Sequence, residues 1–308
     1  MNILITGATG FIGSHLVRNL CADPAHQVSI VTRAQSNLFP LQDVLDKFKV
    51  HQLSTSANNI YSILKEEKPD IVIHLATLYL SQYRPEQLDE MLTANIVFST
   101  KLLDAMAEAG VKKIINTGTF SEYFAGDMEY DPVTLYAATK RAFEDILHFY
   151  VNAKGIKAVT LKLFDTYGPF DYRPKILSIL KKAIKENQCL DFSPGEQAID
   201  LLYIDDVITA FKKAMEFLET NPQSRHEVFF IGSGVSTKIK EIAMTLEDVV
   251  GKKILIRWGA KAYREREVMK SQADIQRAQE ILGWQPKVFL KEGLKKMISE
   301  EARKGHYI

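Results

Sequence analysis

A tyrosine and a lysine four positions apart are the residues of this sequence best suited to chemistry. They are Tyr136 and Lys140, in the run Tyr-Ala-Ala-Thr-Lys. If this run is helical, both side chains lie on one face of the helix. The ammonium can then lower the pKa of the phenol from its ordinary value of about 10. A phenol tuned in this way can exchange a proton with a carbonyl or an alcohol at neutral pH.

A glycine-rich segment near the start of the chain supplies the second observation. Gly7, Gly10 and Gly13 follow an apolar opening and precede an amphipathic stretch. A glycine-rich turn between a strand and a helix accepts the pyrophosphate of a dinucleotide. The alternative, a glycine turn that binds no ligand, is disfavoured because strand, turn and helix occur in the order that the motif requires. Together the glycine turn and the Tyr136–Lys140 pair predict hydride transfer.

Short apolar runs alternate with amphipathic stretches through the first half of the chain. Strands alternating with helices predict β-α-β units and a parallel sheet covered by helices on both faces. Strands are expected at 2–6, 27–32, 49–53, 71–75, 113–117 and 158–164, and helices at 11–21, 60–67, 86–109 and 135–153.

After residue 164 this alternation ends. Helices are expected at 175–186, 238–250, 273–282 and 290–302, and strands that return to the main sheet at 201–204 and 228–231. We therefore predict a doubly wound α/β sheet with a smaller C-terminal lobe interleaved with it. The expected boundaries give residues 1–166 and 199–232 to the dinucleotide-binding domain, and residues 167–198 and 233–308 to the substrate lobe.

Composition and charge exclude several classes of function. The 308 residues include 39 Lys and Arg against 38 Asp and Glu, a net charge of +1 with no long basic block, so no nucleic-acid partner is expected. The two cysteines, Cys21 and Cys189, lack metal-ligand spacing; a single disulfide stays open, but so few cysteines favour a reducing cytosol. No signal sequence and no apolar run of roughly 18 residues are found. We expect a soluble cytoplasmic protein with no membrane partner and no metal.

The motifs together resemble the extended branch of the short-chain dehydrogenase/reductase superfamily. That branch opens with Thr-Gly-x-x-Gly-Phe-Ile-Gly, and residues 6–13 fit the pattern. The resemblance covers essentially the whole chain and implies a Rossmann fold. The cofactor-binding residues that it implies are Gly7, Gly10, Phe11, Ile12, Gly13, Arg33, Leu75, Ala76, Thr77, Thr117, Tyr136, Lys140 and Phe164.

The end of the second expected strand bears on which cofactor is bound. NAD-binding proteins place an acid there for the ribose 2′-hydroxyl, whereas NADP-binding proteins place an arginine near the 2′-phosphate. Residues 31–37 read Val-Thr-Arg-Ala-Gln-Ser-Asn, with Arg33 and hydroxyl groups but no acid. Although a surface arginine is common, this segment favours NADP(H) and leaves NAD(H) open.

The resemblance also implies a catalytic set. Thr119 lies four residues before Tyr123, where the branch has the hydroxyl group that orients the reacting oxygen. Tyr136 is then the acid/base, and Lys140 binds the ribose and lowers the pKa of the phenol. Asn95, with bound water, is expected to relay a proton to Lys140. Each residue alone is more often a packing or surface residue, but their order after the glycine turn favours the catalytic interpretation.

The residues that follow Thr119 restrict the reactions that we expect this chain to catalyse. The sugar-nucleotide 4,6-dehydratases of this branch read Thr-Asp-Glu at the hydroxyl position, because eliminating water needs an acid and a base. Here Thr119 is followed by Phe120 and Ser121. The fucose-synthase type has a cysteine at the position of Ser121. Dehydration and combined 3,5-epimerisation are therefore not expected.

Members of the extended branch usually act on nucleotide-diphosphate sugars, and the second half of the chain has corresponding motifs. Ile199 replaces an arginine that often holds the nucleotide, which leaves the base contacts open. Glu265 and Arg266 are read as ordinary surface residues, and Trp284 as a packing residue of the C-terminal lobe. The substrate-binding residues that the resemblance implies are Thr119, Phe120, Asp165, Arg173, Lys175, Gln197, Arg264 and Glu267.

Several segments are most similar to the reductases related to CDP-abequose and CDP-paratose synthases and to dTDP-4-keto-6-deoxyglucose reductases. The implied reaction is NADPH-dependent reduction of the C4 ketone of a nucleotide-linked 4-keto-6-deoxyhexose or 3,6-dideoxyhexose, for a bacterial-type surface polysaccharide. One alternative is an NAD-dependent sugar 4-epimerase, which has the same catalytic residues. Another is a sensor that binds NADP without catalysis. The resemblance further implies a homodimer formed through the helices at 86–109 and 135–153.

Overall fold

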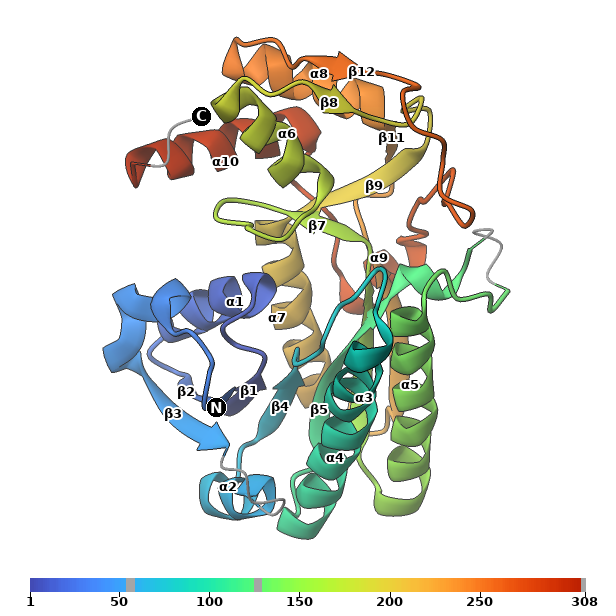
Figure 1. Cartoon of the computed structure of the whole chain (residues 1–308). Coiled ribbons are helices and arrows are strands. Elements are labelled where there is room, and N and C mark those ends of the chain that lie inside the picture. Colours follow the sequence, from blue (N-terminus) through green and yellow to red (C-terminus); the bar gives the residue numbers. More distant parts are fainter. Residues whose placement is uncertain (54–58, 125–128, 306–308) are drawn as a thin grey trace. The chain divides into compact units, whose positions relative to one another are not determined.

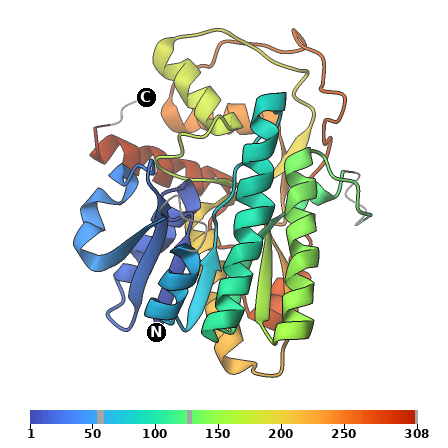
Figure 2. The ribbon, with the colours of Figure 1, turned by 60° about the horizontal axis from the view of Figure 1, so that its bottom comes forward.

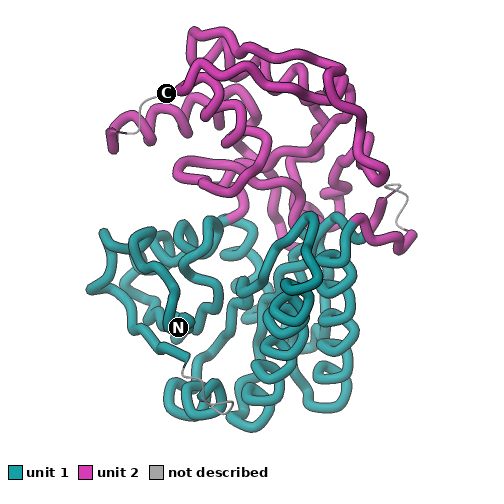
Figure 3. The backbone as a smooth tube through the Cα atoms, in the orientation of Figure 1, with its two compact units in different colours: residues 1–122, 134–162, 208–229 teal, residues 123–133, 163–207, 230–308 magenta. Residues whose placement is uncertain are grey.

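The computed structural model describes residues 1–53, 59–124 and 129–305 (Figure 1). The chain forms two compact units, and it passes repeatedly between them (Figure 3). Unit 1 consists of residues 1–122, 134–162 and 208–229, and unit 2 of residues 123–133, 163–207 and 230–308. Within the described ranges, none of the helices combines the length and apolarity that crossing a bilayer requires. Cys21 and Cys189 are both free thiols.

Unit 1 is built on a seven-stranded sheet of order β10-β6-β5-β4-β1-β2-β3. The pairs β1–β2, β1–β4, β2–β3 and β4–β5 are parallel. Because the strand order reverses between β1 and β4, their carboxyl ends frame the crevice where doubly wound sheets bind ligands. The strands are β1 (Asn2–Thr6), β2 (Gln27–Arg33), β3 (Phe48–Leu53), β4 (Ile71–His74), β5 (Lys113–Thr119), β6 (Lys157–Leu163) and β10 (His226–Ile231).

Helices α2 (Asn59–Glu67), α4 (Phe98–Ala109) and α5 (Leu135–Lys154) pack on one face of this sheet, where α4 and α5 lie side by side (Figures 1 and 2). Their apolar faces form one buried cluster with strand residues such as Leu4 and Ile114. The remaining helical elements of this part of the chain are α1 (Phe11–Cys21), the 3-10 segments η1 (Phe39–Lys47), η2 (Pro85–Gln87) and η4 (Phe120–Glu122), and α3 (Leu88–Leu92). The predicted doubly wound α/β fold is confirmed.

The helix expected at 86–109 forms, but it is not a regular α-helix over its whole length. The 3-10 turn η2 and the short helix α3 precede a π-helical turn, η3 (Thr93–Val97), which leads into α4. A π turn accommodates an extra residue and frequently occurs at functional sites. Here it buries the predicted site residue Asn95, whose side chain makes the hydrogen bonds described below.

Two features between residues 198 and 220 also differ from the expectation. The strand expected at 201–204 does not return to the main sheet: β9 (Ala198–Tyr203) lies in a three-stranded sheet of order β11-β9-β7. The 17-residue helix α7 (Ile204–Thr220) was not predicted. Its signals are nevertheless present: Asp205 and Asp206 begin it, and buried apolar residues recur at helical spacing after them.

Long-range hydrogen bonds explain why β9 belongs to unit 2. The buried carboxylate of Asp200 accepts hydrogen bonds from the backbone amides of Ser233 (2.6 Å), Gly234 (2.9 Å) and Ala273 (2.9 Å). These bonds fix β9 to the segments that follow it. The other elements of unit 2 are β7 (Asp165–Tyr167), β8 (Leu190–Asp191), β11 (Ser236–Lys238), β12 (Ile256–Arg257), α6 (Ile176–Glu186), α8 (Ile239–Val250), α9 (Gln276–Leu282) and α10 (Leu290–Arg303).

Trp284 is buried, as expected of a packing residue. Its indole Nε1 donates a hydrogen bond to the backbone carbonyl of Asp206 (3.0 Å). The Asp206 carboxylate in turn accepts from the amides of Lys287 and Val288. The C-terminal helices are therefore attached to the first turn of α7.

A histidine links three elements of unit 1 through its two ring nitrogens. His74, at the end of β4, shares a hydrogen bond with Thr6 of β1 through Nδ1 (2.7 Å) and with Ser99 of α4 through Nε2 (2.8 Å). The ring is fully buried, and burial, with a smaller contribution from the nearby Lys140, lowers its pKa from 6.5 to about 3. His74 is therefore neutral at physiological pH.

The low pKa of His74 predicts acid sensitivity of unit 1. Because the pKa is lower in the folded state than in the unfolded chain, the unfolded state takes up the proton first as pH falls below 6.5. At pH 5 this single group should cost about 2 kcal/mol of stability. Urea unfolding at pH 7 and pH 5 should show a smaller pH-dependent loss in His74→Asn than in the wild type. Equal losses would contradict the assignment.

Candidate active site

Helix α5 places the tyrosine and the lysine as the sequence predicted. Thr134 caps the helix by accepting a hydrogen bond from the amide of Ala137 (3.2 Å), which fixes the start of the helix at Leu135. Tyr136 and Lys140 follow one turn apart, and their exposed fractions are only 9% and 4%. An early, capped helical turn thus presents a phenol and an amine on one face.

The charge state of Lys140 depends on its surroundings. Burial lowers the pKa of its ammonium from 10.5 to about 8, while attraction to Glu122 and Glu144 opposes this effect. A pKa of about 8 leaves Lys140 largely protonated at neutral pH. The lysine can therefore act as a fixed positive charge near the phenol.

Thr119 is the last residue of β5 and is nearly buried, with 8% of its surface exposed. Its Oγ1 accepts a hydrogen bond from the backbone amide of Ser121 (3.2 Å), at the start of the 3-10 turn that also contains Phe120. This bond uses a lone pair of the hydroxyl oxygen and leaves its proton available to donate.

Tyr79 was not predicted as a site residue. Its ring lies edge-on to that of Tyr136, with centroids 4.9 Å apart and planes at 81°, and 47% of its surface is exposed. Tyr79 belongs to the segment after β4, where the sequence contains no motif that would have identified it.

Asn95 uses its whole amide group in structural hydrogen bonds. Its Oδ1 accepts from the hydroxyl of Thr77 (2.9 Å) and the amide of Leu78 (2.7 Å). Its Nδ2 donates to the carbonyl of Leu78 (3.1 Å) and to Thr139 Oγ1 (3.0 Å). Because Thr139 lies directly before Lys140, Asn95 joins the segment after β4 to the helix that holds the predicted acid/base pair. The predicted proton relay by Asn95 stays a prediction.

The glycine turn after β1 shows why glycine is needed there. Gly7 has φ +71°, and a Cβ on it would lie 2.5 Å from the amide nitrogen of Ala76 and the carbonyl carbon of Leu75. A Cβ on Gly13 would lie 2.3 Å from the carbonyl oxygen of Gly7. The turn therefore packs tightly between β4 and α1, and Gly10 starts α1 with no side-chain cap. Such a helix start offers backbone amides to a phosphate.

Other predicted cofactor residues lie on the same strand ends. Phe11 and Ile12 begin α1, Leu75 and Ala76 follow β4 directly, and Thr77 is exposed after them. Thr117 of β5 has a buried hydroxyl with no hydrogen-bond partner among the described residues. A buried hydroxyl without a partner on β5 and a glycine turn that any Cβ would fill both fit a polar ligand such as a dinucleotide.

Arg33 ends β2 with an exposed side chain. Its backbone amide donates to Ser36 Oγ (3.0 Å), and the amide of Ser36 donates back to its carbonyl (3.0 Å), which closes a tight turn. The guanidinium lies 3.9 Å from Glu90 on α3, and both side chains are about 60% exposed. Such an exposed pair is weak, so Arg33 remains able to bind an anion.

Four predicted residues lie at the start of unit 2. Phe164 is buried against Phe230, with ring centroids 6.2 Å apart. The ammonium of Lys175 donates to Asp165 (2.8 Å), so the structure brings these two predicted substrate residues together. Arg173 donates to both carboxylate oxygens of Asp171 (2.7 and 2.8 Å). Arg173 also donates to the backbone carbonyl of Thr166 (3.0 Å), and so it links β7 to the segment before α6.

The remaining predicted substrate residues lie on two segments that are joined by a hydrogen bond. Gln197 is nearly buried, and the preceding amide, that of Glu196, donates to the phenol oxygen of Tyr263 (3.2 Å). Arg264 and Glu267 follow Tyr263 in a turn in which the amide of Glu267 donates to the carbonyl of Arg264 (3.1 Å). Arg264 is exposed and Glu267 is partly exposed.

Arg266 makes more contacts than an ordinary surface residue. Its guanidinium lies over the ring of Phe124, 4.4 Å from the centroid, and it pairs with Asp131. It also donates to the carbonyl of Pro132 (3.3 Å). Arg266 therefore contacts Phe124, Asp131 and Pro132, which precede Tyr136 in the sequence, and the surface interpretation missed these contacts.

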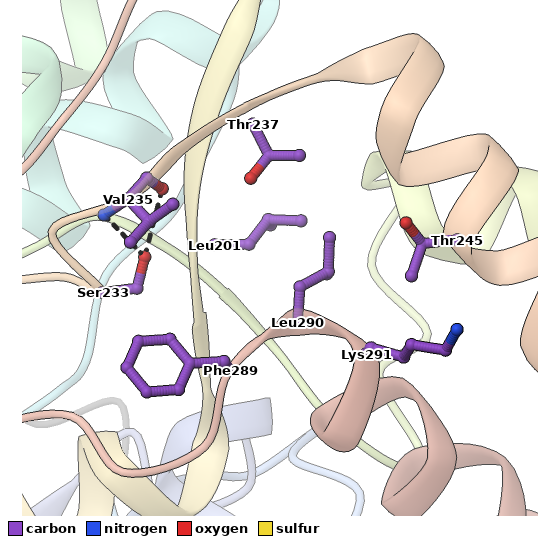
Figure 4. Close-up of a pocket in the computed structure, with 8 residues that line it drawn as sticks. All are labelled: Leu201, Ser233, Val235, Thr237, Thr245, Phe289, Leu290 and Lys291. Carbon is purple, nitrogen blue, oxygen red and sulfur yellow. Dashed lines mark hydrogen bonds between the residues drawn. The ribbon is translucent and has the colours of Figure 1, made fainter.

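Unit 2 contains a cavity of about 320 Å³, and none of the site residues described above lines it (Figure 4). Ser233, whose hydroxyl is bonded to the backbone of Val235, forms one wall, and Phe289 and Leu290 form another. None of its lining side chains belongs to the predicted site, so we assign it no part in the chemistry.

Known proteins are similar to this chain over most of its length. Residues 3–232 match the NAD dependent epimerase/dehydratase family. The chain is 28% identical to CDP-abequose synthase of Salmonella muenchen, over 96% of this chain and 97% of that protein. It is also 28% identical to UDP-glucose 4-epimerase of Mycolicibacterium smegmatis, over 97% of both.

Among solved structures, the chain is similar to UDP-glucuronic acid 4-epimerase from Bacillus cereus in complex with UDP-glucuronic acid and NAD. The TM-score is 0.87 at 28% identity, over 99% of this chain and 100% of that one. The family match spans most of the chain, which confirms the resemblance to the extended branch. The protein therefore belongs to the NAD dependent epimerase/dehydratase family of oxidoreductase-type enzymes.

Proposed function

We propose that this protein reduces the C4 ketone of a nucleotide-diphosphate-linked 4-keto-6-deoxyhexose or 3,6-dideoxyhexose with NADPH, in the synthesis of a surface polysaccharide sugar. The observation that supports this most is Tyr136 placed one turn before a buried Lys140 whose pKa of about 8 keeps it protonated. A ketone reductase needs an acid that gives its proton at neutral pH.

In the proposed reaction the protein's residues handle the oxygen that was the ketone. The Tyr136 phenol donates the proton to it, and the Thr119 hydroxyl donates a hydrogen bond that stabilises its developing negative charge. The Lys140 ammonium stabilises the phenolate that remains and binds the nicotinamide ribose. The bound NADPH supplies the hydride to C4.

We further propose that unit 1 binds the dinucleotide and unit 2 the nucleotide sugar. In unit 2, Lys175 and Arg264 supply positive charge for the diphosphate, and Glu267 and Gln197 supply acceptors and donors for ribose and base. Ile199 stands where an arginine often holds the nucleotide, so the identity of the base stays open in this proposal.

The proposal includes a homodimer formed through α4 and α5. These helices lie side by side, and α5 exposes 57% of the surface of Phe149. An exposed aromatic residue on paired helices is typical of an interface.

The second candidate function is an NAD-dependent 4-epimerase. It is supported by the epimerases among the similar proteins and by a catalytic set that serves both reactions. Arg33 favours the reductase, because β2 ends without the acid that usually holds the ribose of NAD.

The two functions are separated by offering the protein NADPH with a panel of CDP-, dTDP- and GDP-linked 4-keto-6-deoxy sugars. Rapid loss of nicotinamide absorbance with one of them is the expected result, and it identifies the base. No oxidation with any of them, together with NAD that copurifies with the protein, would overturn the proposal in favour of the epimerase.

Replacing the phenol tests the acid. Tyr136→Phe should lower kcat by about 10²–10⁴-fold while NADPH still binds, because only the proton donor is lost. Tyr150→Phe is a matched control on the same helix. The Tyr150 phenol donates to Asp104 (3.1 Å), and burial together with this hydrogen bond raises its pKa to about 12. The control should keep its activity. Equal activity of Tyr136→Phe and the wild type would show that another group is the acid.

Cofactor preference is expected to depend on Arg33 and its acidic neighbour. Arg33→Ala should reduce the preference for NADPH over NADH about tenfold, through loss of a charged hydrogen bond to the 2′-phosphate. Glu90→Gln should shift the preference slightly the other way, because it removes a competing anion 3.9 Å from the guanidinium. Lys65→Ala, which removes an exposed cation from α2, is the control. An unchanged ratio of kcat/KM values in Arg33→Ala would contradict the proposed NADP site.

A further inference from the structure

Four ionisable side chains are buried together, and one of them is Lys140 of the predicted acid/base pair. Glu122 and Lys162 have 0% and 2% of their side chains exposed, and Glu144 has 6%. The Lys162 ammonium lies 2.7 Å from Glu122 and 3.2 Å from Glu144. Lys140 is 4% exposed and is attracted to the same two carboxylates. The group contains two basic and two acidic side chains. Burial raises the pKa of the Glu122 carboxyl, and the charge and the hydrogen bond of Lys162 oppose this effect.

These residues come from separate elements that meet at the site. Glu122 ends the turn that follows Thr119, and Glu144 lies one turn after Lys140 on α5. Lys162 lies on β6, which neighbours β5 in the sheet. The cluster therefore links the strand that presents the hydroxyl group to the helix that presents the phenol.

Gly118 provides the space that this arrangement requires. A Cβ at position 118 would lie 2.9 Å from Cγ of Lys162 and 3.1 Å from Cγ2 of Thr160. Glycine directly before Thr119 thus lets the Lys162 stem cross β5 and reach Glu122. A lysine next to the last residue of a mostly apolar strand is the sequence feature that could have revealed this cluster.

Removing one member would leave an unbalanced charge in a region that water does not reach. A buried charge without a partner is costly, whereas a paired and hydrogen-bonded one is tolerated. Lys140 gains from this balance because burial by itself disfavours its ammonium form.

We propose that Glu122, Lys162 and Glu144 are positioning residues, which hold the Tyr136–Lys140 pair in place and balance the charge on Lys140. The inference rests on the proposed roles of Tyr136 and Lys140. It assigns no contact with substrate or cofactor to the three residues.

Three other titratable groups lie near enough to influence the charges in this cluster. His74 of β4 lies near Lys140. Burial, and to a smaller extent the charge of Lys140, keep the His74 ring neutral. His226 of β10 faces Glu144 and Lys162, and burial lowers its pKa to about 4, so it is also neutral at pH 7. Arg141 of α5 attracts Glu122 from a partly exposed position. Between pH 6 and pH 9 the two histidines therefore keep a constant charge, and changes in this range report on the lysine and the tyrosine.

Opposite charge changes should move the ionisation of the acid/base pair in opposite directions. Glu122→Gln removes a negative charge, which favours loss of a proton from the pair, so its ionisation should shift to lower pH by on the order of one unit. Lys162→Gln should shift it to higher pH. The double variant loses one charge of each sign and should return toward the wild type.

The shift can be measured without any substrate. Near-ultraviolet absorbance reports tyrosinate formation, and subtracting the titration of the same variant in a Tyr136→Phe background isolates Tyr136. The alkaline limb of the pH–rate profile for NADPH oxidation should move in parallel. If the protein has no reductase activity, the titration still tests the cluster, so failure of the inference and failure of the proposed function are distinguishable.

The matched control is the ion pair of Lys113 and Glu219, which lies at the other end of β5 and is partly exposed (2.6 Å). The variants Lys113→Gln and Glu219→Gln should leave the titration unchanged. Glu122→Gln could instead lose activity at all pH values while neither titration moves. That result would mean either that the cluster only supports the fold or that Glu122 is already protonated in the native protein. Both explanations would overturn the inference.

Discussion

Burial of the Lys140 ammonium is the constraint on which the rest of the site depends. Burial favours the neutral amine, and the pKa stays near 8 because Glu122 and Glu144 supply negative charge. Glu122 in turn is paired with Lys162, whose stem occupies the space that a Cβ at position 118 would need. Strands β5 and β6 and helix α5 are therefore coupled by charge as well as by packing.

Close backbone approach and hydrogen bonding shape the part of unit 1 around the glycine turn. Gly7 and Gly13 allow β1, β4 and α1 to meet at distances that any Cβ would prevent. Asn95 uses its whole amide to hold the segment after β4 against α5, and His74 ties β1, β4 and α4 together. A dinucleotide that binds at these strand ends would meet a surface whose shape is already set, which lowers the cost of ordering on binding.

Local patterns in the sequence predicted the parts of the structure that local interactions determine. β1 and α1 have the predicted bounds because the glycine turn separates them sharply, and α5 begins where predicted because Thr134 caps it. The sheet to which β9 belongs depends on hydrogen bonds that Asp200 accepts from amides 33 to 73 positions away, which no local pattern reveals. The π turn at Asn95 likewise forms through contacts with other segments, and the partners of Lys162 become visible only in three dimensions.

The most direct test of the account follows the hydride itself. NADPH with deuterium at the transferred position is supplied together with the accepted 4-keto sugar nucleotide, and the product is examined by NMR. If the proposed reductase function is right, the product carries deuterium on C4 of the sugar, in an amount equal to the NADPH consumed. A product that contains no deuterium and forms without loss of NADPH would contradict the reductase and indicate an epimerase that recycles a bound NAD.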